Sequence, residues 1–135
     1  MVDRGDTRTL YLDGQPHSAM DLDDPTRHVF DYTRYFHASL LFTDDADIDR
    51  VLFVGGGGFT GPRIFHEMYP NATVDVVELD PAVIGAADRY FGIPDSPRMN
   101  VHRGDGRRFL TETNRTYDVI VLDAYRKDSV PFQLT

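Results

Sequence analysis

The sequence has 135 residues, 41% of them hydrophobic, which is enough for one compact domain with a single core but too little for two. Its 22 acidic residues outnumber the 14 lysines and arginines, and the resulting formal charge of -8 makes nucleic acid and anionic membranes poor partners. No segment approaches the roughly 20 apolar residues of a membrane span. Cysteine is absent, which excludes disulfides and zinc–thiolate sites, so a cytoplasmic location is the default expectation.

The first 25 residues predict a small hairpin unit. Thr7 to Leu12 alternates as a strand does, and Asp13-Gly14 directly after it is a strong signal for a tight hairpin turn. Beyond the polar break that ends at Pro25, apolar residues recur at near-helical spacing. They predict a lead-in helix from about Thr26 to Phe42.

From Arg50 onward, short β-branched runs alternate with helical stretches, a pattern typical of βαβ units and a parallel sheet. The fold class is therefore α/β, with residues 26–135 forming a Rossmann-like, doubly wound parallel sheet in the order 3-2-1-4. The sheet is expected to be truncated, because such folds usually continue into further C-terminal strands. The expected strands are Arg50–Val54, Thr73–Glu78, Asn100–His102 and Tyr117–Leu122, and the expected helices are Gly61–Tyr69, Pro81–Phe91 and Gly106–Glu112.

A glycine-rich loop follows the first of these strands. Gly56, Gly58 and Gly61 match the spacing G-x-G-x-x-G ahead of a helix, where glycines permit a tight turn and close approach of the backbone to a ligand. An ordinary glycine-rich turn would look the same, so the loop alone is weak support for nucleotide binding.

Acidic residues stand at the ends of the following strands. Glu78 lies 22 positions after Gly56, where a carboxylate can accept both ribose hydroxyl protons, and Asp105 follows the third strand, where it can accept from an adenine amino group. These acceptors favour a cofactor with one nucleoside and no phosphate, of the S-adenosylmethionine type. Asp123 ends the fourth strand and is either a catalytic base or a cap. The histidines show no metal-ligand spacing, so no metal is expected.

Four segments together resemble the spermidine synthase family, the polyamine aminopropyltransferases with a class I S-adenosylmethionine-binding core. They read VLFVGGGG, VDVVELDP, HRGDGRRFL and YDVIVLDAY, and LYLDGQPHSAMD with FDYTRYFH is similar to that family's N-terminal hairpin and lead-in helix. Class I methyltransferases share the glycine loop and the acidic strand ends.

The resemblance assigns roles by position. It implies that Glu78 binds the ribose hydroxyls, Asp105 the adenine and Gly55 to Gly57 the methionine-derived tail, and that Asp123 deprotonates the attacking amine. It also implies further cofactor and substrate contacts; these are Leu79 and Gly106 for the cofactor, and Tyr32, Tyr125 and Arg126 for the substrate.

Several positions depart from the family pattern. The Asp that usually follows the three glycines is Gly58, and the second Asp expected three residues after Asp123 is Arg126. Tyr32-Thr33-Arg34 replaces a Tyr-His-Glu triplet, and His17 replaces a glutamine. Nucleoside contacts are kept while polyamine contacts are lost, which counts against ordinary spermidine synthesis.

The expected function is transfer of an aminopropyl group from decarboxylated S-adenosylmethionine, or use of S-adenosylmethionine itself, with a small-molecule amine as acceptor. The alternatives are a methyltransferase and a noncatalytic nucleoside-binding module, with a nicotinamide-dependent dehydrogenase last. Because the apolar fourth strand would form a sheet edge, the chain is expected to form a homodimer or higher oligomer through that strand or the hairpin. Such a fragment is also expected to show weak or no catalysis.

Overall fold

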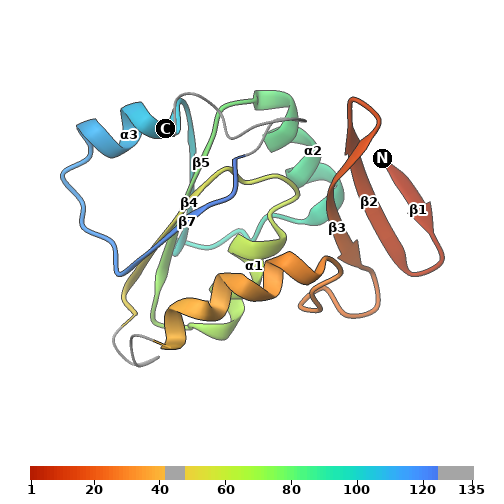
Figure 1. Cartoon of the computed structure of the whole chain (residues 1–135), viewed down its shortest axis with the longest axis horizontal. Helices are drawn as coiled ribbons and strands as arrows, with labels where there is room; N and C mark the ends of the chain where they lie inside the picture. Colours follow the sequence, from red (N-terminus) through yellow and green to blue (C-terminus); the bar gives the residue numbers. More distant parts are fainter. Residues whose placement is uncertain (42–47, 125–135) are drawn as a thin grey trace.

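The computed structural model describes residues 1–41 and 48–124. For residues 39–41 it describes the backbone alone. It shows an α/β architecture with two sheets, as the sequence predicts. A three-stranded antiparallel sheet lies at one end, on the right of Figure 1, and a four-stranded parallel sheet with its helices forms the rest.

The N-terminal sheet consists of β1 (Val2–Arg4), β2 (Thr7–Leu12) and β3 (Gln15–Asp21). The predicted hairpin joins β2 to β3, and both turn residues have positive φ, 50° at Asp13 and 75° at Gly14, as a tight hairpin turn requires. The strand β1, which the sequence analysis did not predict, pairs with β2 as a third strand.

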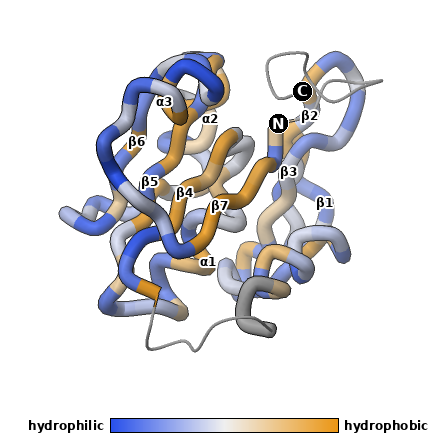
Figure 2. The backbone as a smooth tube through the Cα atoms, turned by 60° about the vertical axis from the view of Figure 1, so that its left-hand side comes forward, coloured by the Kyte–Doolittle hydropathy of each residue, from blue (hydrophilic) through white to orange (hydrophobic). Residues whose placement is uncertain are grey.

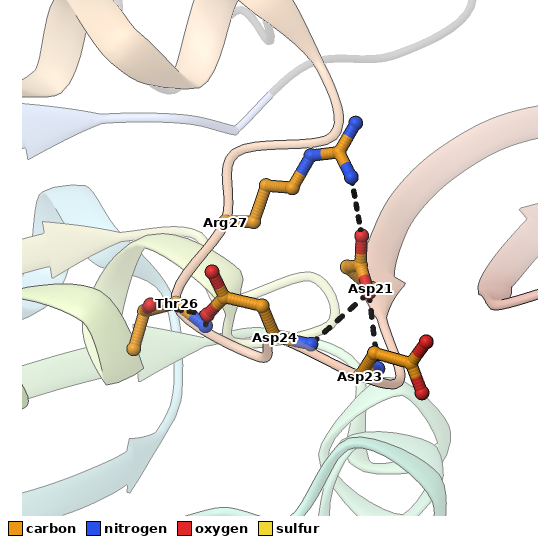
Figure 3. Close-up of polar contacts among 5 residues, drawn as sticks. All are labelled: Asp21, Asp23, Asp24, Thr26 and Arg27. Atoms are coloured by element: carbon orange, nitrogen blue, oxygen red, sulfur yellow. Dashed lines mark hydrogen bonds and ion pairs between the residues drawn. The ribbon is translucent and has the colours of Figure 1, made fainter.

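Figure 3 shows the acidic turn that leads out of β3. Asp21 accepts hydrogen bonds from the backbone N–H groups of Asp23 (3.0 Å) and Asp24 (3.1 Å) and pairs with Arg27 (2.9 Å). The Asp24 amide lowers the pKa of Asp21 against a smaller opposing effect of burial, and the Asp23 amide and Arg27 lower it further. Because the Asp21 carboxylate is hydrogen-bonded within the turn, we assign the turn a structural role rather than a binding one.

The lead-in helix is a 3₁₀ helix, η1 (Asp31–Leu41). It begins five residues later than the predicted start at Thr26, and that boundary was wrong because Thr26 belongs to the turn: its backbone N–H donates to the Asp24 side chain (3.1 Å). The predicted last residue, Phe42, lies outside the described residues.

The parallel sheet has the order β6-β5-β4-β7, the predicted 3-2-1-4 arrangement. Three helices follow its first three strands. The bounds are β4 (Arg50–Val54), α1 (Thr60–Met68), β5 (Thr73–Glu78), α2 (Pro81–Phe91), β6 (Met99–Arg103), α3 (Gly106–Glu112) and β7 (Val119–Leu122). The last strand starts two residues later than predicted. Tyr117 and Asp118 instead contact other strands: Tyr117 donates to Asp75 (2.7 Å), and Asp118 accepts from the Arg50 N–H (2.9 Å).

Hydrophobic residues cover both faces of the parallel sheet, and its strands stand out as apolar in Figure 2. On one face Phe53 and Val76 pack with Phe65 of α1 and Ala87 of α2, all nearly inaccessible to water. On the other face lie Leu52, Val54 and Val77, against which Phe109 and Leu110 of α3 pack. Helices therefore cover both sides, as in a doubly wound fold.

The outer strand β7 pairs only with β4 among the residues the structure describes. Its Ile120 and Leu122 are each 49% exposed, so the expected apolar edge is present. Oligomerisation through this edge stays a prediction.

Candidate functional site

The carboxyl ends of the parallel strands meet at one edge of the sheet. The glycine loop, residues 55–59, follows β4, while Glu78 ends β5 and Asp123 follows β7. In open α/β sheets this edge is where ligands bind. The topology thus brings together three features that the sequence keeps far apart.

Close backbone packing requires glycine at the start of the loop. Gly55 has φ +95°, and a Cβ atom there would lie 2.6 Å from the carbonyl oxygen of Asp123. On its other side, the Gly55 N–H donates to the carbonyl of Val77 (2.8 Å). The first residue of the loop therefore packs between the end of β5 and the residue that follows β7.

The backbone amides of the loop all donate within the protein. Those of Gly56 (2.9 Å) and Gly57 (3.4 Å) both reach Oε2 of Glu78, whose Oε1 accepts from the Asp80 N–H (2.9 Å). The Gly58 N–H donates to Ser18 Oγ of β3 (2.7 Å), and the Phe59 N–H to the carbonyl of Gly56 (2.7 Å). The carboxylate predicted to bind ribose thus closes the glycine loop in this structure.

Asp123 has the most perturbed carboxyl group near the loop. Burial raises its pKa to about 7, and the negative charge of Glu78 adds to the shift. Within residues 1–41 and 48–124, no hydrogen bond reaches the Asp123 side chain. A carboxylate with a pKa near neutrality is well matched to accept a proton.

A small cavity of about 10 Å³, room for about one water molecule, lies in front of Asp123, and residues of η1 form part of its wall. Tyr32, one of the predicted substrate residues, is 43% exposed at this wall and makes an edge-on ring contact with Phe36 (centroids 5.8 Å apart). The pocket combines hydroxyl groups with aromatic surface and one acidic group. Its lining residues are Ser18, Ala19, Phe30, Tyr32, Thr33, Phe36, Gly56, Thr60, Gly61 and Asp123.

A hydrogen-bonded chain fixes the beginning of η1. The Thr33 hydroxyl donates to the carbonyl of Phe30 (2.6 Å), so His28 Nδ1, which lies 2.7 Å from Thr33 Oγ1, is the donor in that contact. Burial lowers the pKa of His28, and in the neutral form of this imidazole Nε2 accepts from His37 Nε2 at 3.1 Å. These contacts hold the N-terminal part of η1 in place.

Other predicted cofactor residues lie beside this site with local structural roles. Asp105 caps α3 by accepting from the Arg108 N–H (2.9 Å), and Leu79 is 58% exposed directly after Glu78. Gly106 allows close packing, since a Cβ there would collide with Cγ1 of Val54. Tyr125 and Arg126 lie outside the described residues.

Sequence reasoning missed the contribution of β3 to the site. Ser18 reaches Gly58 across 40 positions of sequence, and Thr60 donates to the carbonyl of Ala19 (3.0 Å). No local spacing signals such contacts. Among the described residues there is no group of three potential metal ligands, and no helix there is long and apolar enough to cross a membrane.

Comparisons with known proteins agree with this geometry. Residues 29–132 match the spermine/spermidine synthase domain family. A polyamine aminopropyltransferase of Vibrio vulnificus (strain CMCP6) is 35% identical over 126 residues, which cover 90% of this chain and 42% of that protein.

Two solved structures extend the comparison. The crystal structure of a probable spermidine synthase from Corynebacterium glutamicum ATCC 13032 superposes with a TM-score of 0.83 at 29% identity, over 96% of this chain and 48% of that one. Human methyltransferase-like protein 13, solved in complex with SAH, gives a TM-score of 0.65 at 31% identity, over 76% of this chain and 50% of that one. The chain spans about half the length of these relatives. The predicted resemblance is confirmed: the chain belongs to the spermine/spermidine synthase family.

Proposed function

We propose that the protein binds decarboxylated S-adenosylmethionine and transfers its aminopropyl group to an amine acceptor. The observation that carries this proposal is the hydrogen bonding of the glycine loop, because residues 55–59 leave no backbone N–H free to bind a carboxylate. S-adenosylmethionine carries a carboxylate on its tail, whereas the decarboxylated form ends in an ammonium group. The nearby carboxyl groups of Glu78 and Asp123 favour the cationic tail.

The chemistry would be nucleophilic displacement at the propyl carbon bonded to the sulfonium. The amine nitrogen of the acceptor forms a new carbon–nitrogen bond while the carbon–sulfur bond breaks, and Asp123 accepts the proton that this nitrogen loses. Methylthioadenosine leaves with the bonding electron pair, and the sulfonium charge is neutralised. The pKa of about 7 makes Asp123 a stronger base than an ordinary carboxylate.

Methyl transfer is the second candidate. It is favoured by the similarity to human methyltransferase-like protein 13, whose structure contains SAH. The same scaffold would then hold S-adenosylmethionine, with its carboxylate bound by groups other than the loop amides. A noncatalytic nucleoside-binding role is the third candidate.

Product analysis separates the three candidates. The protein is incubated with decarboxylated or intact S-adenosylmethionine and a panel of amines, and the sulfur-containing products are identified by mass spectrometry. Release of methylthioadenosine from the decarboxylated form supports aminopropyl transfer. S-adenosylhomocysteine alone would show methyl transfer, and calorimetric binding of methylthioadenosine with neither product would show a binding module.

The proposal also covers the chemical class of the amine that receives the aminopropyl group. With Arg126 in place of a family carboxylate, we propose an uncharged or anionic amine rather than a diamine, because like charges repel. Putrescine is the informative substrate: rapid aminopropyl transfer to putrescine that is lost in Asp123→Asn would overturn this choice of acceptor while supporting the transferase.

A further inference from the structure

The N-terminal sheet contacts the glycine loop and α1 through successive residues of one strand. In β3, Ser18 accepts from the Gly58 N–H (2.7 Å), and the carbonyl of Ala19 accepts from the Thr60 hydroxyl (3.0 Å). Both contacts are buried. The strand therefore runs alongside the loop and joins it directly to the N-terminal sheet.

The side chain of Ser18 also fills the space beside two loop glycines. A Cβ atom on Gly57 would lie 2.6 Å from Ser18 Oγ, and one on Gly58 would lie 2.7 Å from Ser18 Cβ. Gly57 has φ +50° in addition, which side chains rarely adopt. Ser18 and the two glycines are thus complementary in shape, and Ser18 excludes a side chain at position 58.

Two anchors hold the central amides of the loop. Glu78 of β5 accepts from Gly56 and Gly57 on one side, and Ser18 of β3 accepts from Gly58 on the other. Four consecutive glycines have high intrinsic backbone freedom, so the loop's shape depends on such partners. A buried N–H deprived of its acceptor is costly, and the loop can avoid that cost only by moving.

We propose that Ser18 is a positioning residue for the adenosyl co-substrate: its hydroxyl fixes the glycine loop in the shape that presents Gly55–Gly57 and Glu78 to the ligand. The inference rests on the proposed function. It makes the N-terminal sheet a structural part of the co-substrate site, although Ser18 itself takes no part in the chemistry.

The test compares Ser18→Ala with Ser96→Ala as the matched control. Each variant removes a serine hydroxyl that accepts from a backbone N–H, but Ser96 accepts from Arg98, outside the glycine loop. Calorimetry with methylthioadenosine should show about tenfold weaker binding for Ser18→Ala, the usual effect of one lost hydrogen bond, and less than about threefold for Ser96→Ala. In steady-state assays the KM for the adenosyl substrate should rise while the KM for the amine stays unchanged.

Amide exchange measured by NMR on the unliganded protein provides a readout that needs no ligand. Exchange at Gly56–Gly58 should be faster in Ser18→Ala and near the wild-type rate in Ser96→Ala. If Ser18→Ala does not fold, Ser18→Cys takes its place, and its weaker acceptor should give a smaller increase in exchange.

The outcomes separate this inference from the proposed function. Wild-type affinity and wild-type loop exchange in Ser18→Ala, or in Ser18→Cys where that variant takes its place, would overturn the role of Ser18 and leave the transferase proposal intact. If the wild type binds no adenosyl ligand, the proposed function and the co-substrate role of Ser18 both fail. In that case, faster loop exchange in the substituted protein would show only that Ser18 holds the loop.

Discussion

Asp75 lies buried within β5 and Asp123 lies partly buried directly after β7, and the surroundings of the two carboxyl groups differ. The side chain of Asp75 is 2% exposed and accepts hydrogen bonds from Asn100 (2.9 Å), Arg115 (2.8 Å) and Tyr117 (2.7 Å). Burial alone would raise the pKa of Asp75, yet these three donors together hold it below its usual value. For Asp123, burial raises the pKa to about 7, with a further contribution from Glu78.

The contrast separates a structural carboxylate, Asp75, from Asp123, which we propose is the catalytic base. The partners of Asp75 come from β6 and from the segment before β7, so one side chain ties three parts of the fold together. Asp123 instead faces a pocket. Both carboxylate oxygens of Asp75 accept hydrogen bonds, which lets the buried charge stabilise the fold. The Asp123 carboxyl group accepts none from the residues that the structure describes, so a ligand can bind to it.

The largest expected effect is on activity. Asp123→Asn keeps the size of the side chain but removes the base, so turnover should fall by about 10² to 10⁴-fold. Steady-state rates measure this loss, and methylthioadenosine binding serves as the control, because the variant should bind it as well as the wild type does. Retained turnover would show that another group takes the proton.

The second effect concerns stability. Asp75→Asn should lower the free energy of unfolding by about 1–3 kcal/mol, because it disrupts a buried network. Urea unfolding measures the change. Glu112→Gln is the matched control, since it removes one carboxylate charge from the exposed Arg108–Glu112 pair, and it should change stability by less than about 0.5 kcal/mol. Equal effects in the two variants would contradict the structural role of Asp75.

The third effect is the pH dependence of the reaction. Because Asp123 must be ionised to accept a proton and its pKa is about 7, the rate should fall up to about tenfold for each pH unit below 7. A pH–rate profile with the acceptor at saturation tests this. A profile without an inflection between pH 6 and 8 would count against Asp123 as the base.

The fourth effect is an opposite pH dependence of stability at the two carboxylates. The raised pKa of Asp123 contributes stability below the unfolded-state pKa of about 4, and this contribution is lost as pH rises through about 7. The lowered pKa of Asp75 contributes stability above about 4, which is lost as pH falls through its folded-state pKa. Relative to wild type, Asp123→Asn should therefore gain stability between pH 5 and 8, whereas Asp75→Asn should lose less at pH 3 than at pH 7. The free energy of unfolding of each variant and of the wild type, measured across this pH range, decides whether the two pH dependences have opposite signs.

Local patterns predicted most of the parallel sheet. The bounds of β4, β5, α2 and α3 follow from β-branched runs and helix-capping residues, and the strand order follows from right-handed crossovers. The late start of η1 was missed because side-chain hydrogen bonds in an acidic turn override helical periodicity. Likewise, the positions of Glu78 and Asp123 could be predicted from strand ends, but the contact of Ser18 with Gly58 depends on how two sheets pack.

The contact between Gly55 and the carbonyl of Asp123 has a consequence for how variants behave. With 2.6 Å between that oxygen and a Cβ atom placed on Gly55, the two segments cannot move independently once a side chain is added. Gly55→Ala would push the exit of β7 outward and displace the Asp123 carboxylate. If Asp123 is the base that we propose, Gly55→Ala would impair proton transfer even though Gly55 itself takes no part in that step, because the two residues are in backbone contact.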